Sequence, residues 1–300
     1  MSTQVTTAFV QQYSANVQML AQQNGSKLKA CVRNEPVVGK QAFFDQIGAT
    51  AARRRTSRHS DTPRMDTPHA RRRVAVEDFD WADLIDAEDK VRTLIDPTST
   101  YAMSAAKAMG RAMDEVMVDA ALGTSYTGET GSNSVTLAAF QSGSQIIAHG
   151  SAGLTIPKLL SAKQLLDAAD VDSENRYIAV TSSQVKDLLN TSQVTSSDYN
   201  TIKALVQGQV DTYLGFTFVR VDGTRIDGTK ILPTTTVGGS IRKCIAWQRD
   251  CVLLGLGSSP SARITERPDK NYATQVFYSM SIGATRMQEV GVVEIDCQES

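Results

Sequence analysis

The chain has 300 residues, 41% of them hydrophobic, which is typical of a globular protein with one large or two modest cores. Its formal net charge of −1 argues against a dedicated nucleic-acid binder, because such proteins are normally basic overall. The first residues lack the basic and apolar segments of a secretory signal, and no stretch approaches about eighteen apolar residues, so we expect a cytosolic protein without a membrane role.

Residues 1–35 are rich in Gln, Asn, Ser and Thr. Within them, Phe9, Tyr13, Val17 and Leu20 recur at the spacing of one helix face. This apolar stripe is narrow, so a helix here would need another surface to cover it. We predict an N-terminal arm that docks on something else.

Residues 36–96 carry two opposite blocks of charge. Between residues 51 and 73, two aspartates face eight arginines: Arg53, Arg54, Arg55, Arg58, Arg64, Arg71, Arg72 and Arg73. From residue 74 to residue 96 the balance is reversed, with eight acidic residues against Lys90 and Arg92. The net charge of the two blocks is therefore roughly +6 and then roughly −6.

The same segment cannot fold around a core of its own, because its basic block has few apolar side chains and two Asp-Thr-Pro turn signals. A loop of this length inside a compact domain is usually functional. We predict an extended β-hairpin loop, with one strand near residues 41–47, a return strand near residues 73–79 and a Pro-rich tip between them.

The two charge blocks leave three interpretations open. A nucleic-acid patch would contact phosphates and bind in a salt-dependent way, whereas a flexible charged loop would have no fixed partner. At an interface, the basic block would meet the acidic block of the same subunit or of a neighbour. We favour the interface because the charges are nearly equal and opposite. The predicted inter-subunit contacts are Arg53, Arg54, Arg55, Arg71, Arg72, Arg73, Asp83, Asp86 and Asp89.

Residues 97–122 are predicted to form one long helix. Asp96 is a suitable N-cap, Pro97 fits the first helical position, and Gly123 would end the helix with a positive φ. At about 1.5 Å per residue, the helix would be about 38 Å long. Three methionines at helical spacing are expected to pack in a core rather than to bind a ligand: Met109, Met113 and Met117.

The rest of the chain mixes short helices and strands. Residues 124–153 are rich in Gly, Ser and Thr and predict a surface loop or an irregular hairpin. Helices are predicted at residues 157–169, from Ser182 as a cap to residue 189, and more weakly at 201–210. Strands are predicted at residues 177–180, 216–221, 243–247, 251–256, 274–282 and 290–295. The last two strands have no nearby partner, so we expect them to pair beside the long helix, which gives an α+β fold with two domains.

No catalytic motif is recognisable. The sequence has no phosphate-binding loop, nucleophile elbow or zinc-protease helix. Nitrogen and oxygen donors cluster at His59, Asp61, Asp66 and His69, but two prolines and neighbouring arginines disfavour a cation site. The four cysteines lie far apart without C-x-x-C spacing, which predicts reduced, buried thiols: Cys31, Cys244, Cys251 and Cys297. We therefore predict no enzyme, no cofactor and no metal.

The order of these parts, and several short sequences, resemble the major capsid proteins of tailed bacteriophages, whose fold is shared with encapsulins and the herpesvirus shell floor. The sequences are FFDQIG (residues 43–48), DTPHARR (66–72), WADLID (81–86), DKVR (89–92) leading to Asp96 and Pro97, and SIGATR (281–286) followed by VVEI (292–295). The resemblance covers nearly the whole chain, and none of these sequences is a catalytic motif.

The resemblance implies an N-terminal arm at residues 1–35, an extended loop at 36–96, and a peripheral domain with a spine helix at 97–150 and 262–300. An apical domain would occupy residues 151–261. It also implies pentamers and hexamers of an icosahedral virion shell around double-stranded DNA, which the protein would contact non-specifically. The shell would assemble in the bacterial cytoplasm, with a portal protein and with a scaffolding protein and a decoration protein as further partners. The chain starts directly at the arm, so we expect the scaffolding protein to be a separate chain.

Two other hypotheses belong to different classes of function. An encapsulin-like compartment would share the fold but carry cargo enzymes, and a cargo-peptide groove beside the arm would distinguish it. A hydrolase or nucleic-acid enzyme would need a catalytic constellation, which the sequence does not show.

Overall fold

The computed structural model describes residues 22–55, 57–58, 64–86, 98–138, 145–190, 212–235 and 240–299. Several predictions lie outside these residues: the apolar stripe at 9–20, the helix at 201–210, Asp89, and the helix start at Asp96 and Pro97. Within the described part, helices and three β-sheets form an α+β fold, as predicted.

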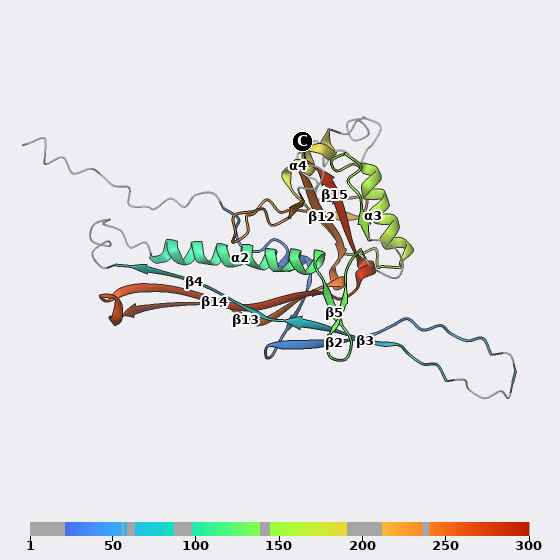
Figure 1. The fold of residues 1–300 in the computed structure, drawn as a ribbon, viewed down its shortest axis with the longest axis horizontal. Coiled ribbons are helices and arrows are strands. Elements are labelled where there is room, and N and C mark those ends of the chain that lie inside the picture. The colour runs from blue at the N-terminus through green and yellow to red at the C-terminus, as the bar shows by residue number, and fades with distance from the viewer. Residues whose placement is uncertain are drawn as a thin grey trace, which may run out of the picture.

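The long helix, α2 (Thr98–Leu122), lies along a four-stranded sheet (Figure 1). The strand order is β1 (Arg33–Pro36), β13 (Val252–Arg267), β14 (Ala273–Arg286) and β4 (Glu77–Ile85). The predicted core methionines Met109, Met113 and Met117 are buried and pack with Met280 and Ile282 of β14. Helix and sheet thus form two layers around one core, because each has only one apolar face.

A second core lies in a seven-stranded sheet covered by two helices, α3 (Ile156–Ala168) and α4 (Ser182–Leu189). The strand order is β7 (Ile146–Ile147), β15 (Val292–Gln298), β12 (Ile241–Gln248), β8 (Arg176–Val180), β10 (Phe216–Arg220) and β9 (Thr212–Tyr213), with β11 (Thr234–Thr235) also paired to β12. Leu159, Leu166 and Leu188 of the helices are fully buried against this sheet. In Figure 1 the unit rises from the C-terminal end of α2.

The third sheet contains the predicted hairpin. Its order is β2 (Gln41–Ile47), β3 (His69–Ala75), β5 (Ser125–Thr127) and β6 (Asn133–Val135). β2 has the predicted bounds, and β5 and β6 form the irregular hairpin expected after α2. Figure 1 shows the hairpin loop projecting away from the rest of the subunit. Four 3-10 turns complete the described elements: η2 (Lys29–Cys31), η4 (Arg249–Cys251), η5 (Pro268–Lys270) and η6 (Glu289–Gly291).

The predicted return strand at residues 73–79 is wrong, because this stretch contains the end of β3 and the start of β4, which belong to different sheets. Between them, the chain crosses β14 at Gly283, where a Cβ would lie 1.9 Å from the carbonyl oxygen of Ala75. The crossing therefore needs glycine and separates one β-rich run into two strands.

Two predicted helix ends are also corrected. Thr181, and not Ser182, precedes α4, and its backbone N–H donates to Oε1 of Gln184 at 3.2 Å, as in a capping box. Gly123 ends α2 but is not among the described residues with positive φ. Its N–H donates to the carbonyl of Asp119 at 2.7 Å, and a Cβ would lie 2.5 Å from that oxygen. Close approach, and not a left-handed backbone, is what favours glycine here.

The sheets do not divide the chain at the expected boundary of residue 262. β13 starts at Val252 and pairs with β14 beside α2, whereas β15 pairs with β12 in the seven-stranded sheet. The chain therefore crosses between the sheets at η4, after β12, and crosses back at η6, after β14. At both crossings only a short segment with a 3-10 turn separates a strand of one sheet from a strand of the other, so these connections between the two cores contain no flexible linker.

Residues 23–35, expected to belong to the arm, pack on the body of the subunit. Leu28 and Val32 are buried in the core of α2, and Trp247 donates its indole N–H to the carbonyl of Cys31 at 2.9 Å. The buried carboxylate of Asp114 on α2 accepts hydrogen bonds from the Ser26 hydroxyl at 2.6 Å, from the N–H groups of Lys27 and Leu28 at 3.1 Å, and from the Gln23 amide. Burial removes water from this carboxylate, and these donors take the place of that water.

Gly110 makes this packing sterically feasible. One turn before Asp114, a Cβ at Gly110 would lie 2.4 Å from the carbonyl carbon of Gly25. In an exposed helix, Gly→Ala stabilises by about 1 kcal/mol. Here we expect Gly110→Ala to lower the free energy of unfolding by about 2 kcal/mol, because residues 23–28 must move away from Asp114. Urea unfolding measures this change.

The matched control is Ala106→Gly at an exposed position of the same helix. Ordinary helix propensity predicts a loss of about 1 kcal/mol there. A Gly110→Ala protein that is more stable than the wild type would show that the chain does not cross α2 at this point.

Candidate inter-subunit surface

The three consecutive arginines of β3 point to opposite faces of the hairpin, because side chains alternate along a strand. Arg72 is 8% exposed, and its Nη2 lies 2.5 Å from Oε2 of Glu289 inside the subunit. Arg71 and Arg73 are half-buried on the other face. Only two of the three predicted contact residues in this tract are therefore available at the surface.

The outer face of the hairpin combines cations with apolar rings. Nε of Arg71 lies 2.6 Å from Oδ1 of Asp45, and its guanidinium lies 5.7 Å from the Phe43 ring centroid. The hydrogen bond from Arg71 lowers the pKa of the Asp45 carboxyl. Arg73 lies 4.5 Å from the centroid of the Tyr126 ring, a cation–π distance. Phe43 and Ile47 are 41% and 72% exposed, so this face has apolar surface to bury on a partner.

The predicted contacts Arg53, Arg54 and Arg55 lie in the projecting loop and are exposed. Arg55 donates from Nε to the carbonyl of Ser57 at 2.9 Å, which is within the same loop. Among the residues that the structure describes, no acidic side chain forms an ion pair with any of the three. The charges at this end of the loop are therefore not compensated by the described part of the subunit.

The described acidic residues of the second block lie on β4, the edge strand of the four-stranded sheet, and at Asp86 directly after it. Asp78, Asp80 and Asp86 are exposed, and Asp83 is half-buried with its Oδ1 accepting from the N–H of Leu84 at 2.8 Å. Within the described residues, β4 pairs on one side only, with β14. The edge thus presents unpaired backbone groups together with carboxylates.

The projecting basic loop and the far end of β4 lie at opposite ends of the described part of the subunit. In Figure 1, β3 and β4 follow one another across the molecule, with the basic loop projecting at one end and the acidic end of β4 at the other. The projecting loop therefore does not reach the far end of β4 within one subunit, whereas at the junction of β3 and β4 Arg73 and Glu77 line the same pocket.

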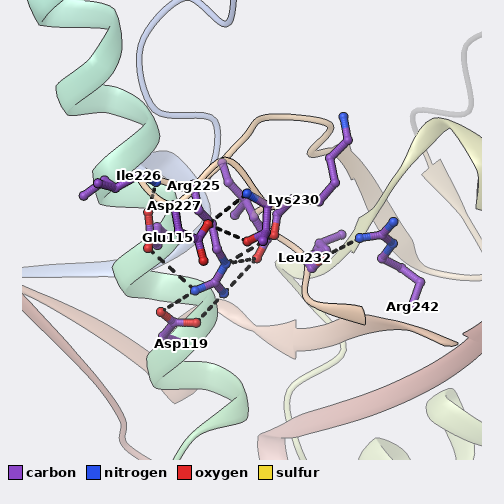
Figure 2. A network of polar contacts seen from close by, with 10 residues as sticks. Glu115, Asp119, Arg225, Ile226, Asp227, Lys230, Leu232 and Arg242 are labelled. Atoms are coloured by element: carbon purple, nitrogen blue, oxygen red, sulfur yellow. Dashed lines mark hydrogen bonds and ion pairs between the residues drawn. The ribbon is translucent and has the colours of Figure 1, made fainter. Parts of the chain in front are cut away.

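A polar network that the sequence analysis did not anticipate joins the seven-stranded unit to α2 (Figure 2). Nη1 of Arg225 donates to Oδ2 of Asp119 at 2.8 Å, and Nη2 donates to the carbonyl of Ile231 at 3.0 Å. The N–H of Ile226 donates to Oε2 of Glu115 at 3.2 Å. The hydrogen bond to Asp119 raises the pKa of Arg225. No local pattern marks this network, because its partners are about a hundred residues apart in sequence.

No metal-binding cluster of three or more His, Cys, Asp or Glu side chains occurs in the part of the chain that the structure describes. In that same part, no helix has the length and apolarity to span a bilayer. All four cysteines are free and buried, and burial raises the pKa of Cys31 to about 11 and that of Cys251 to about 12. Such thiols are protonated at neutral pH and are poor nucleophiles.

The comparisons with known proteins decide the family. The model of the phage capsid protein family matches residues 5–299. The chain belongs to this family. It is therefore a structural component of the phage capsid, not an enzyme, and it associates with copies of itself. No curated protein matches the sequence.

Solved phage capsids share the fold of this capsid protein over its full length. The capsid of cyanophage P-SCSP1u superposes with a TM-score of 0.73 at 16% identity, covering 100% of this chain and 96% of that one. The structure from Mycobacterium phage Che8 has a TM-score of 0.67 at 15% identity, covering 96% of this chain and 97% of that one. The capsid of Ralstonia phage GP4 has a TM-score of 0.70 at 9% identity, covering 98% of this chain and 96% of that one. The tailed-phage capsid fold suggested by the sequence is confirmed.

Replacement of Arg225 tests the network between the capsid protein's two cores. Arg225→Ala removes three hydrogen bonds to the carbonyls of Lys230 and Ile231 and both contacts with Asp119. We expect the free energy of unfolding to fall by about 2 kcal/mol, as for other partly buried charged hydrogen bonds. Arg267, whose pairing with Asp269 is exposed, is the control, and Arg267→Ala should cost less than about 1 kcal/mol. Equal losses in urea unfolding would contradict a special role for Arg225.

Proposed function

We propose that this capsid protein forms the pentamers and hexamers of an icosahedral shell that encloses double-stranded DNA. The observation that carries the proposal is the separation of the basic loop from the acidic edge of β4. Complementary surfaces at opposite ends of one molecule pair head to tail between copies. Such heterologous contacts close into rings when the rotation between neighbours allows it. The assignment to the phage capsid protein family supports the same conclusion.

In this proposal each part of the subunit has a separate role. The seven-stranded unit, which includes β15, would surround the capsomer axis as the apical domain. α2 with the four-stranded sheet would form the peripheral domain, and the hairpin would extend over a neighbour. A projecting hairpin has little core of its own, so burial of Phe43 and Ile47 on another copy would give it stability that the isolated subunit lacks.

The remaining partners follow from the same role. A scaffolding protein, a portal protein and a decoration protein are proposed as partners in shell assembly in the bacterial cytoplasm. Contact with packaged DNA would be non-specific and weak, because a chain with a net charge of −1 attracts phosphates only through local basic patches.

Electron microscopy of the purified protein, alone and with candidate scaffolding proteins, tests the shell directly. We expect uniform hollow shells tens of nanometres across. Small monodisperse particles under every condition would contradict self-sufficient or scaffold-assisted shell formation.

A charge exchange tests the head-to-tail contact. Reversal of the loop (Arg53→Glu with Arg54→Glu) and reversal of the edge (Asp80→Lys with Asp86→Lys) should each abolish shells, because like charges would then meet. All four positions are exposed, so the subunits should stay folded. The chain with all four changes restores opposite charges in every contact, and we expect it to form shells again.

The control for the charge exchange is Arg53→Lys with Arg54→Lys, which keeps the loop basic and should assemble normally. Shells of normal yield from the loop reversal alone or from the edge reversal alone would show that these charges do not form the contact. Failure of the fourfold variant, with all subunits folded by circular dichroism, would show that the loop and the edge do not meet each other.

A further inference from the structure

Three charged side chains are buried together where the hairpin joins the subunit. Arg72 of β3, Arg286 at the end of β14 and Glu289 of η6 are 8%, 0% and 3% exposed. We call them the loop-root cluster. Two guanidiniums and one carboxylate leave it with a formal charge of +1, an unusual content for a protein interior.

Arg286 connects the cluster to the end of α2. Its Nη1 donates to the carbonyls of Ala121 and Gly123 at 2.7 and 2.6 Å, and its Nη2 donates to the carbonyl of Val135 at 3.0 Å. The last carbonyls of a helix have no partners within the helix and carry partial negative charge, so a guanidinium is well suited to them. Burial lowers the pKa of Arg286, but a guanidinium remains charged at physiological pH. Arg286 therefore holds β6 and the C-terminus of α2 against β14.

Arg72 and Gln46 connect the cluster to the hairpin. Nη2 of Arg72 lies 2.5 Å from Oε2 of Glu289, and its Nε donates to Oε1 of Gln46 at 3.3 Å. Nε2 of Gln46 in turn donates to the carbonyl of Met287 at 2.7 Å. Each strand of the hairpin thus sends one polar side chain to the short segment between β14 and β15.

The contact between hairpin and body ends at these residues. Val74 is fully buried with Leu253 and Met287. Towards the tip of the loop, Ile47 on β2 and His69 and Ala70 on β3 are all exposed. The described residues of the loop beyond β2 and β3 project from the subunit (Figure 1). The direction of the projecting part is therefore set at its root, where a small rotation produces a large displacement of the tip.

Stability alone does not account for the cluster. Nη1 of Arg72, Nε of Arg286 and Oε1 of Glu289 have no hydrogen-bond partner among the described residues, and unpaired buried polar atoms are costly. Apolar side chains of similar size often replace a buried ion pair without loss of stability. What such side chains lack is directional geometry, because a short charged hydrogen bond tolerates much less rotation than an apolar contact.

We propose that Arg72 and Glu289 are positioning residues that fix the direction in which the extended loop leaves the subunit. Arg286 extends this constraint to the end of α2, so that loop and helix keep one relative orientation. The consequence for shell geometry rests on the proposed function, but the constraint itself is a property of the single subunit.

Paired variants test the proposal. In Arg72→Met and in Glu289→Met one charge remains buried without its partner, so both should lower the melting temperature of the subunit. The double variant Arg72→Met with Glu289→Met removes both charges and should recover most of the loss. Hydrogen exchange of backbone amides on the soluble double variant should nevertheless be about tenfold faster in β2 and β3, with unchanged exchange in β13 and β14.

The control is Arg242→Met with Glu299→Met, which removes a largely buried ion pair in the seven-stranded unit and should leave exchange in the hairpin unchanged. Wild-type exchange rates in β2 and β3 of a folded Arg72→Met, Glu289→Met subunit would overturn the proposal. So would equal acceleration in all three sheets, which indicates general loosening. Because exchange is measured on unassembled subunits, failure here is distinct from failure of the wild-type protein to form shells.

Discussion

The architecture depends on the packing of α2 against the four-stranded sheet, since three other segments of the subunit are attached to that helix through charged side chains. Asp114 binds residues 23–28, Asp119 and Glu115 bind the segment around Arg225, and the final carbonyls bind Arg286. A helix is rigid over its length, so contacts made at three of its turns have fixed relative positions. The apolar seam of Met109, Met113 and Met117 supplies the stability, and the polar contacts supply the orientation.

How much of this could be predicted depends on how local the signal is. The bounds of α2 follow from its periodic apolar face and its glycine stop, and those of β2 from alternation and neighbouring turns. The predicted strand at residues 251–256 is much shorter than β13, because residues 255–262 contain two glycines and three serines that weaken the strand signal. Pairing with β14 nevertheless extends along most of β13. Crossing points such as Gly283, and the networks of Asp114 and Arg225, join residues far apart in sequence and have no local signature.

The arginine tract of β3 shows why composition alone does not assign a role. Three identical residues in a row have no polar and apolar alternation, so the sequence does not indicate which of them points inward. The structure places Arg72 with Glu289 in the interior and leaves Arg71 and Arg73 beside aromatic rings on the outer face. One basic tract therefore serves both the subunit's interior and its surface. A charge count would give all three side chains to the same contact, whereas the pleat of the strand separates them.

The acidic residues of β4 have a consequence for which pairings a subunit allows. An exposed edge strand pairs readily with any other edge, including its own copy in a second subunit, and charged side chains are the usual means of preventing this. Two β4 edges brought together would place carboxylates against carboxylates, which disfavours a symmetric dimer. The same carboxylates attract the basic loop of a neighbour in the proposed head-to-tail contact. Repulsion and attraction from one set of side chains thus favour the heterologous pairing, and only that pairing continues around a ring.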